Sequence, residues 1–147
     1  IYRAHIRHLT KQSPHTKLTE SEPFKLSLLY KHYSNIMRKI EKQMNQAIRG
    51  QRNWSGSNTT VFTTDNGLES TVYLHGNHIA TYFHYDRTLQ IFDGGWQSVT
   101  TKSRLNALLD EFKPQFKVFQ KNWSWFVSGG GSAVFPFDSG LKIKSLN

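Results

Sequence analysis

The apolar residues of this chain change their spacing near Trp54, and that change limits the folds open to it. Between Phe24 and Ile48 they recur every three or four positions, which is the spacing of one helical face. The stripe consists of Leu29, Tyr33, Ile36, Ile40, Met44 and Ala47. After Trp54, short runs of Thr, Val, Ile and aromatic residues alternate with Gly, Asn and Asp, which is typical of strands and turns. We therefore predict an α+β chain, with a long N-terminal basic amphipathic helix before an antiparallel β-meander, one packed helix and short C-terminal strands.

The first helix has sequence signals at both of its ends. Thr19 and Glu22 have the spacing of a capping box, Pro23 suits a first turn, and Gly50 ends the helical pattern. The chain is accordingly divided into a basic arm, 1–18, a basic amphipathic helix, 19–53, and a β-rich α+β domain, 54–147. A helix of 25 residues spans roughly 37 Å, longer than a small sheet is wide. This length favours docking of the apolar stripe on a partner or a second copy, with docking on the chain's own sheet as the alternative.

The β-rich part contains a meander and a second helix. The predicted strands cover residues 57–64, 70–75, 78–85, 88–92, 116–120, 123–127, 133–137 and 141–144. Turn signals separate the first four of them, at Asp65-Asn66-Gly67, Gly76-Asn77 and Asp86-Arg87. The second helix is capped by Ser98 or Thr100 and stopped by Pro114.

The net charge of +9 is concentrated at the front of the chain. Residues 1–53 hold 11 Lys and Arg against 3 Asp and Glu, or +8, whereas residues 54–147 hold 8 against 7, or +1. Four of the cations lie within about 20° of one line along the predicted helix, opposite the apolar stripe. They are Lys31, Arg38, Lys42 and Arg49.

This cationic face contains almost no acidic residue. Only Glu41 supplies a negative charge between Phe24 and Arg52. A helix face that serves solubility usually mixes both signs, so this one favours contact with a polyanion such as nucleic acid. A plain solvated face remains the alternative.

A second candidate anion site lies at the start of the second helix. Lys102 and Arg104 are close to the helix N-terminus, where the helix dipole disfavours cations but free N–H groups suit a phosphate. The other interpretation is a structural cap, with Trp96 anchoring the preceding strand in the core. The clustered rings around Trp123 and Trp125 also have two interpretations: one sheet face is core, and the other could stack bases.

No residue pattern predicts catalysis, and we expect no enzyme, no catalytic residue, no metal and no cofactor. The chain has no cysteine. His75 and His78 lack a third ligand nearby, and Asp65, Asp86 and Asp93 lie in predicted turns, where they have ordinary turn chemistry. The sequence contains no Walker-type phosphate loop and no Ser-His-Asp context. It also has no apolar run of the ~18 residues that a membrane span needs, and its front lacks the apolar region of a signal peptide.

Three motifs resemble a family of small, uncharacterised bacteriophage proteins. They are Asn58-Thr59-Thr60-Val61, the "LHGNxIA" hairpin at residues 74–80, and the "GWxSxTTKxRLN" strand-to-helix turn at residues 95–106. The resemblance covers about residues 57–127 and leaves out the basic helix. It implies a phage origin and a fold, and it assigns no catalytic residues.

Together these patterns predict a non-enzymatic phage-type protein that binds nucleic acid mainly through phosphates, without sequence specificity. The nucleic-acid-binding candidates are Lys31, Arg38, Lys42, Arg49, Lys102 and Arg104. The alternative is a protein-interaction module, acting on a host or phage protein or in virion assembly through the N-terminal helix. A homo-oligomer through the same helix is also open. We expect no membrane partner, and a location in the host cytoplasm or in association with the virion.

Overall fold

The computed structural model describes residues 21–145, and for residues 21–24 and 33–38 it describes the backbone alone. The chain divides into two compact units, Ile1–Arg38 and Lys39–Asn147. The division falls inside the first helix and not near Trp54, where the apolar spacing changes. The predicted arm, residues 1–18, and the capping residue Thr19 lie outside the described residues.

Helix α2 spans Ser21–Arg49, close to the limits that the apolar spacing predicts. Its last turns belong to the second unit, where Met44, Ala47 and Ile48 are completely buried in the hydrophobic core. For these three residues, docking on a partner is therefore wrong, and the chain's own domain covers them. The physical reason is that a long helix need not bury its whole length on one surface, so the argument from helix length did not apply to its end.

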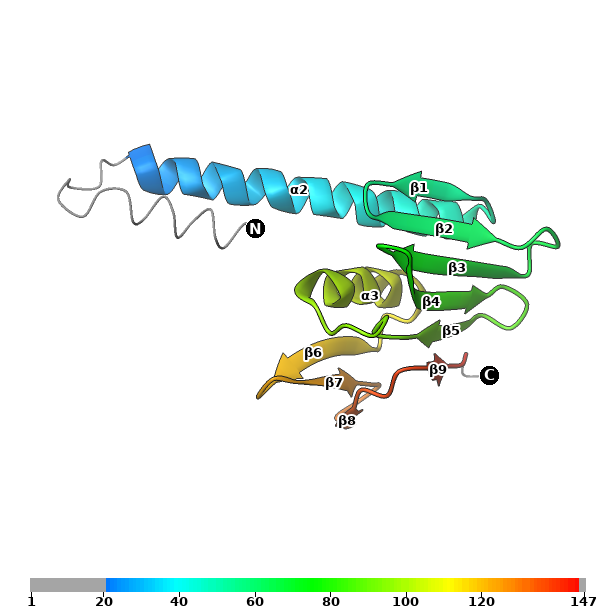
Figure 1. The fold of residues 1–147 in the computed structure, drawn as a ribbon. Coiled ribbons are helices and arrows are strands. Elements are labelled where there is room, and N and C mark those ends of the chain that lie inside the picture. The colour runs from blue at the N-terminus through cyan, green and yellow to red at the C-terminus, as the bar shows by residue number, and fades with distance from the viewer. Residues whose placement is uncertain (1–20, 146–147) are drawn as a thin grey trace. The chain divides into compact units, whose positions relative to one another are not determined.

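The second unit is built on a six-stranded antiparallel sheet (Figure 1). Its strands, in spatial order, are β1 (Trp54–Gly56), β2 (Thr59–Thr63), β3 (Glu69–Leu74), β4 (Asn77–Phe83), β5 (Thr88–Ile91) and β9 (Leu141–Ile143). The predicted four-stranded meander is confirmed as β2 to β5. Strand β1 was not predicted, and β9 returns from the chain's end to pair with β5.

The β3–β4 hairpin turns one residue earlier than the sequence predicted. Leu74 pairs with Asn77, so the two turn residues are His75 and Gly76, with φ of 51° and 78°. Two successive residues with positive φ are the signature of the tight turn that matches strand twist. Tyr73 faces His78 in the same register, and a bulge then shifts it, so that Val72 pairs with Ala80.

A second, three-stranded sheet consists of β6 (Lys117–Lys121), β7 (Ser124–Ser128) and β8 (Val134–Pro136). The predicted strand start at Trp123 is wrong, because Trp123 is a turn residue with φ of 67° that is 90% exposed. Trp125 is buried. The two tryptophans therefore do not share a sheet face, as simple alternation had suggested.

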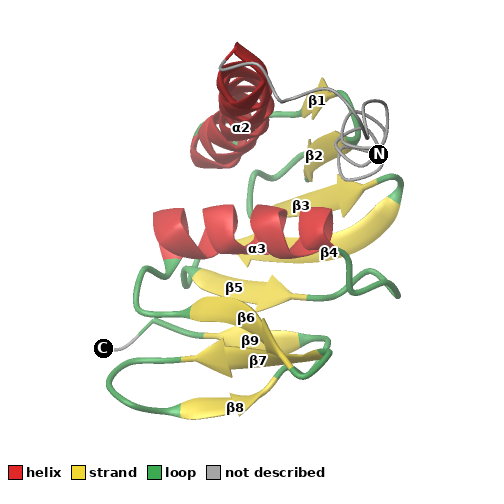
Figure 2. Ribbon diagram, turned by 90° about the vertical axis from the view of Figure 1, so that its left-hand side faces the viewer, coloured by secondary structure: helices red, strands yellow, loops and turns green. Residues whose placement is uncertain are grey.

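Helix α3, Val99–Phe112, lies across the larger sheet and joins it to the smaller one (Figure 2). Its Leu105, Leu108 and Leu109 are completely buried in the common core. Asn106 fixes β6 to the helix, since its amide donates to the Val118 carbonyl oxygen at 2.9 Å and accepts from the Val118 N–H at 2.8 Å. Ser98 is the N-cap, and the helix ends at Phe112, two residues before Pro114.

Candidate nucleic-acid interface

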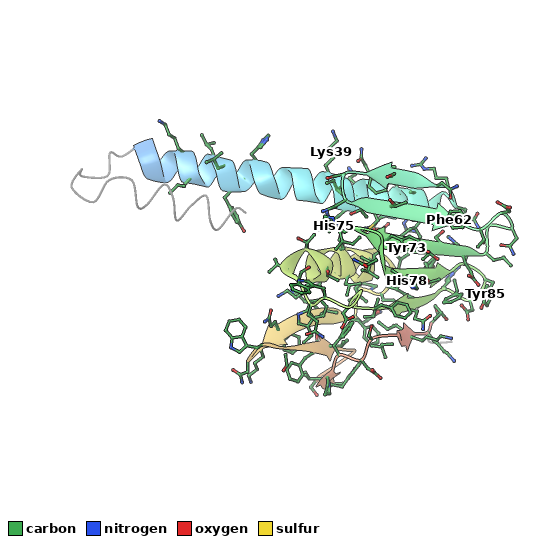
Figure 3. The ribbon with its side chains drawn as sticks, in the orientation of Figure 1. Lys39, Phe62, Tyr73, His75, His78 and Tyr85 are labelled. Atoms are coloured by element: carbon green, nitrogen blue, oxygen red, sulfur yellow. The ribbon has the colours of Figure 1, made fainter. Side chains whose placement is uncertain are left out.

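The cations of α2 that the structure describes lie on its exposed surface. Lys31 and Lys42 are both exposed, as the charge pattern predicts for a solvent-facing side. Lys39 is exposed as well and was not among the predicted residues (Figure 3). The side chain of Arg38 is not among those described. Of the described residues, none forms an ion pair with Lys31, Lys39 or Lys42.

Arg49 differs from these lysines because it is already neutralised. Its guanidinium forms an ion pair with Glu111 of α3 and donates a further hydrogen bond to the Glu111 carbonyl oxygen at 3.3 Å. It also lies 5.2 Å from the ring centroid of Phe112. Arg49 therefore links α2 to α3, and its charge is only partly free for a ligand.

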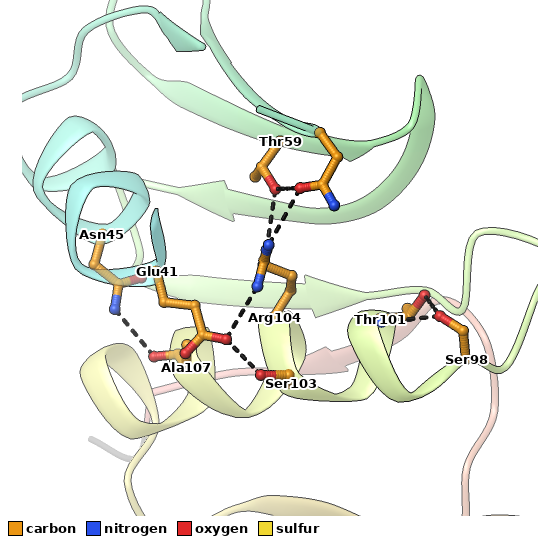
Figure 4. A network of polar contacts seen from close by, with 9 residues as sticks. Glu41, Asn45, Thr59, Ser98, Thr101, Ser103, Arg104 and Ala107 are labelled. Atoms are coloured by element: carbon orange, nitrogen blue, oxygen red, sulfur yellow. Dashed lines mark hydrogen bonds and ion pairs between the residues drawn. The ribbon is translucent and has the colours of Figure 1, made fainter. Parts of the chain in front are cut away.

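Arg104 does not face solvent at all. It is completely buried, and its guanidinium ion-pairs with Glu41 at 3.1 Å while Nε donates to the Thr59 hydroxyl at 3.0 Å (Figure 4). The Asn58 side-chain oxygen accepts a further hydrogen bond at 3.2 Å. Arg104 thus joins α3, the last turns of α2 and the start of β2. This position leaves it no contact with a phosphate at the surface, so we leave it out of the interface.

The same network changes the charge balance of α2. Glu41 is the only acidic residue between Phe24 and Arg52, and it points inward to bind Arg104 and the Ser103 hydroxyl. A carboxylate that pairs with a buried cation no longer neutralises the exposed lysines of its own helix. Lys31, Lys39 and Lys42 therefore have no other acidic residue near them in the helical sequence, since Glu41 is the one acid between Phe24 and Arg52.

The hydrogen bonds at the start of α3 show that Ser98 acts as a structural N-cap. The Ser98 hydroxyl accepts from the Thr101 N–H at 3.1 Å and lies 2.8 Å from the Thr101 hydroxyl. Lys102 is half-buried in the first turn, with its N–H bonded to the Ser98 carbonyl oxygen. Of the two cations predicted for this site, only Lys102 keeps access to solvent.

Trp96 lies outside the core. It is 75% exposed, so the prediction that it anchors the end of β5 is wrong. The preceding Gly94 and Gly95 both have positive φ and carry the chain out of the sheet before α3 begins. Trp96 lines a small cavity of about 110 Å³ together with His75 and Asp93.

The face of the larger sheet that points away from the core carries a row of rings. The Tyr73 and His78 rings lie 5.8 Å apart and the His78 and Phe92 rings 4.3 Å apart, measured between centroids (Figure 3). Phe62 on the neighbouring strand is exposed on the same face. Partly exposed rings on adjacent strands are the kind of surface on which single-stranded nucleic acids stack their bases.

Two histidines of the sheet are shifted toward the neutral form. Burial lowers the pKa of His78, while a hydrogen bond with the Ala80 carbonyl oxygen raises it to a smaller extent. Burial also lowers the pKa of His84, whose Nε2 lies 2.8 Å from the Ser70 hydroxyl.

In the part of the chain that the structure describes, His, Asp and Glu side chains do not gather in groups of three that could hold a metal ion. None of the described helices is long and apolar enough to cross a membrane.

The second unit is thus a small α+β domain in which a basic helix is tied to an antiparallel sheet by a buried ion pair. The chain belongs to the Kyanoviridae Gp96 protein family, whose sequence model matches residues 37–144. The phage origin that the resemblance implied is confirmed. The match reaches further forward than the three motifs do, and it includes Glu41 and the other core residues of α2. No curated protein and no solved structure matches the chain significantly.

Proposed function

We propose that this phage protein is a non-enzymatic nucleic-acid-binding protein that holds phosphates with the exposed cations of α2. The observation that carries the proposal is the inward turn of Glu41, which leaves Lys31, Lys39 and Lys42 without another acidic residue between Phe24 and Arg52. The contacts come from Lys31, Arg38 and Lys42, which the sequence places on one line of the helix, and from Lys39 beside that line. Phosphate contacts of this kind carry no base readout, so the binding is independent of sequence.

Salt dependence tests this proposal. Each phosphate contact contributes about 0.7 to 0.9 to the slope of log affinity against log salt concentration. The triple variant Lys31→Gln, Arg38→Gln, Lys42→Gln is therefore expected to weaken binding and to reduce that slope by about 2 to 3 for a short DNA followed by fluorescence anisotropy.

The matched control removes the same charge elsewhere. Lys117, Lys121 and Lys142 are exposed on strands, and the variant Lys117→Gln, Lys121→Gln, Lys142→Gln should change the slope by less than about 1. Equal losses in the two triple variants would mean that net charge alone drives binding, and the helix would not be the interface.

The ring-bearing face of the sheet gives a reason to compare single and double strands. If bases stack on Phe62 and Tyr73, their replacement by Ala should weaken binding of a single strand and leave binding of a duplex unchanged. Equal effects on both forms would remove stacking from the proposal and leave the phosphate contacts.

The proposal also predicts that the protein does not cleave nucleic acid. DNA and RNA incubated with the protein and Mg²⁺ or Mn²⁺ should remain intact, because the sequence shows no set of metal-binding carboxylates. Cleavage that disappears in Asp93→Asn or His75→Ala would reveal an active site and contradict the proposal.

The alternative, a protein-interaction module, is favoured by one separate observation. Leu28, Leu29 and Tyr30 of the first unit are between 41% and 61% exposed. Apolar side chains that gather in this way often mark an interface with another protein or a second copy. The double variant Leu28→Glu, Leu29→Glu should then abolish an oligomer seen by light scattering, or the capture of a host or virion protein. An unchanged oligomer and unchanged capture in this variant would exclude this surface. In either function, we expect the protein to act in the host cytoplasm or in the virion.

A further inference from the structure

A second cavity of the folded domain has a composition that neither the sequence patterns nor the proposed interface explains. It measures about 380 Å³, within the range of roughly 300 to 1,000 Å³ typical of small-molecule sites. Its lining comes from the end of α3, from β4, from the β4–β5 turn and from the tail after β9. Three of its residues are cationic, Arg87, Lys113 and Lys144, and none is acidic.

Lys113 is the most informative of the three cations. It is only 6% exposed, and its ammonium donates one hydrogen bond, to the Ser145 hydroxyl at 3.0 Å. No carboxylate of the described residues forms an ion pair with it. The C-terminus of α3 favours a cation at this point, but a helix end supplies only a partial charge. A part-buried ammonium without a full counter-charge is less well solvated than one in water, and a bound anion would offset that loss.

Burial and charges of both signs act on Lys113. Burial lowers its pKa, Asp86 acts in the opposite direction, and Arg87 lowers it further. Asp86 is exposed, and its carboxylate accepts a hydrogen bond from the Thr88 N–H. Arg87 adopts a φ of 59°, a left-handed conformation that arginine rarely takes, and this conformation places a second cation at the cavity.

Aromatic rings line the same cavity. Tyr82 and Phe112 contact each other with centroids 4.4 Å apart, and Phe116 lines the cavity beside them. Flat apolar walls next to cations fit a ligand that has both a planar ring and a negative group. An inorganic anion alone would make no contact that uses these rings.

We propose that this cavity binds a nucleoside phosphate, with the phosphate at Lys113, Arg87 and Lys144 and the base against the rings of Tyr82 and Phe116. Two sources share this chemistry: a free mononucleotide, and the phosphorylated end of a nucleic-acid strand. The site lies wholly in the second unit and uses none of the α2 cations. It therefore does not depend on the function proposed above.

Calorimetric titration of the full chain with four probes tests the site. AMP and UMP should bind, while adenosine and inorganic phosphate should each bind at least about tenfold more weakly, because each lacks one half of the recognised group. Adenosine that binds as well as AMP would overturn the role of the cations. Phosphate that binds as well as AMP would overturn the role of the rings, and the failure of every probe would overturn the site.

Two substitutions that preserve the fold test whether the nucleotide binds in this cavity. Arg87→Asn suits the positive φ, and Lys113→Met keeps the buried volume, so melting temperatures should not fall. Each should weaken AMP binding about tenfold, whereas the exposed control Lys121→Gln should leave it within about twofold. Full AMP affinity in both Arg87→Asn and Lys113→Met would place the ligand elsewhere and overturn the proposal.

Short single strands with and without a 5′-phosphate identify the source. A phosphorylated strand that binds more tightly than AMP assigns the site to strand ends. Equal binding of AMP and the phosphorylated strand assigns it to the free nucleotide, and both results support the site. In the α2 triple variant, which lacks three of the proposed helix contacts, a strand without the 5′-phosphate that binds as well as the phosphorylated strand would contradict it.

Discussion

A buried guanidinium needs a counter-charge, and for Arg104 of α3 that charge is the carboxylate of Glu41 on α2. The two residues are 63 positions apart in the sequence. Lys113, whose ammonium is part-buried, and Arg104, which is completely buried, are both cations of this domain, yet of the two only Arg104 has a carboxylate partner among the described residues. This difference separates a residue that holds the fold together from one that is available to a ligand. Arg49 is intermediate, because its pair with Glu111 is exposed to solvent.

Removing one member of the Arg104–Glu41 pair should destabilise the domain severely. Glu41→Ala removes the carboxylate that pairs with the buried guanidinium, and we expect a loss of about 3 to 5 kcal/mol in the free energy of unfolding. Urea unfolding measures it. Glu111→Ala is the matched control, since its pair with Arg49 is exposed and should contribute no more than about 1 kcal/mol. The double variant Glu41→Ala, Arg104→Met should lose less than the sum of its single variants, and full additivity would show that the two side chains do not interact.

The two shifted histidines should make stability depend on pH. Burial depresses the pKa of His78 and His84 in the folded state, so the unfolded chain takes up protons at a higher pH than the folded chain. Stability should therefore be fully present above about pH 6.5 and should fall as the pH drops toward the depressed values. His84→Gln should flatten this fall in thermal melts between pH 7 and pH 5, and the exposed His75→Gln should not. Identical profiles for His84→Gln and the parent protein would remove this explanation.

At the scale of single elements, local signals explain most of what forms. Ser98 begins α3 and Pro114 follows its end, while α2 begins and ends within three residues of the limits that its apolar spacing predicts. The turns are less regular than the strands. The His75–Gly76 and Asn122–Trp123 turns both place residues other than glycine at positive φ, and in each case the sequence prediction was displaced by a residue.

The cap of α3 gives an element-scale test, because the sequence left Ser98 and Thr100 open as the N-cap. Ser98→Ala removes the acceptor of the Thr101 N–H and should cost about 0.5 to 2 kcal/mol of unfolding free energy. Thr100→Ala, one residue inside the helix, should change stability by less than about 0.5 kcal/mol. Chemical denaturation measures both variants, and a larger loss for Thr100→Ala would contradict the cap assignment.

At the scale of the whole molecule, the last turns of α2 are part of the domain's core. Glu41, Met44, Ala47 and Ile48 supply a counter-charge and apolar surface that the sheet and α3 need. The family match, which begins at residue 37, covers the same segment. The unit that folds is therefore expected to begin near Lys39 and not at Trp54.

Two truncated chains test that boundary. A chain of residues 39–147 should melt cooperatively and remain monomeric or keep the parent's oligomeric state. A chain of residues 54–147 loses two large buried side chains, each contributing about 1.5 to 3 kcal/mol, and also loses Glu41, the carboxylate that pairs with Arg104. It should aggregate or lack a cooperative transition in calorimetry with light scattering. A chain of residues 54–147 that melts like residues 39–147 would show that the helix end is dispensable.

The sequence by itself determined the features that depend on neighbours along the chain. The spacing of apolar residues predicted both helices and most strands, because a helix and a strand each repeat their faces within a few residues. The same local rules predicted the meander β2 to β5, whose strands pair with their immediate successors. The charge split between the front and the rest of the chain was also readable, since it is a property of composition.

Only the tertiary structure decided which charges remain available. Lys102 and Arg104 are two residues apart on one helix, yet one keeps access to solvent and the other is completely buried against Glu41. The cavity at Lys113 likewise joins segments that are up to about sixty residues apart, from Tyr82 to Ser145. Burial and pairing of this kind depend on contacts between distant segments, and no pattern along the chain records them. The physical reason is that a side chain's charge belongs to its residue, whereas its solvation and its partners belong to the fold.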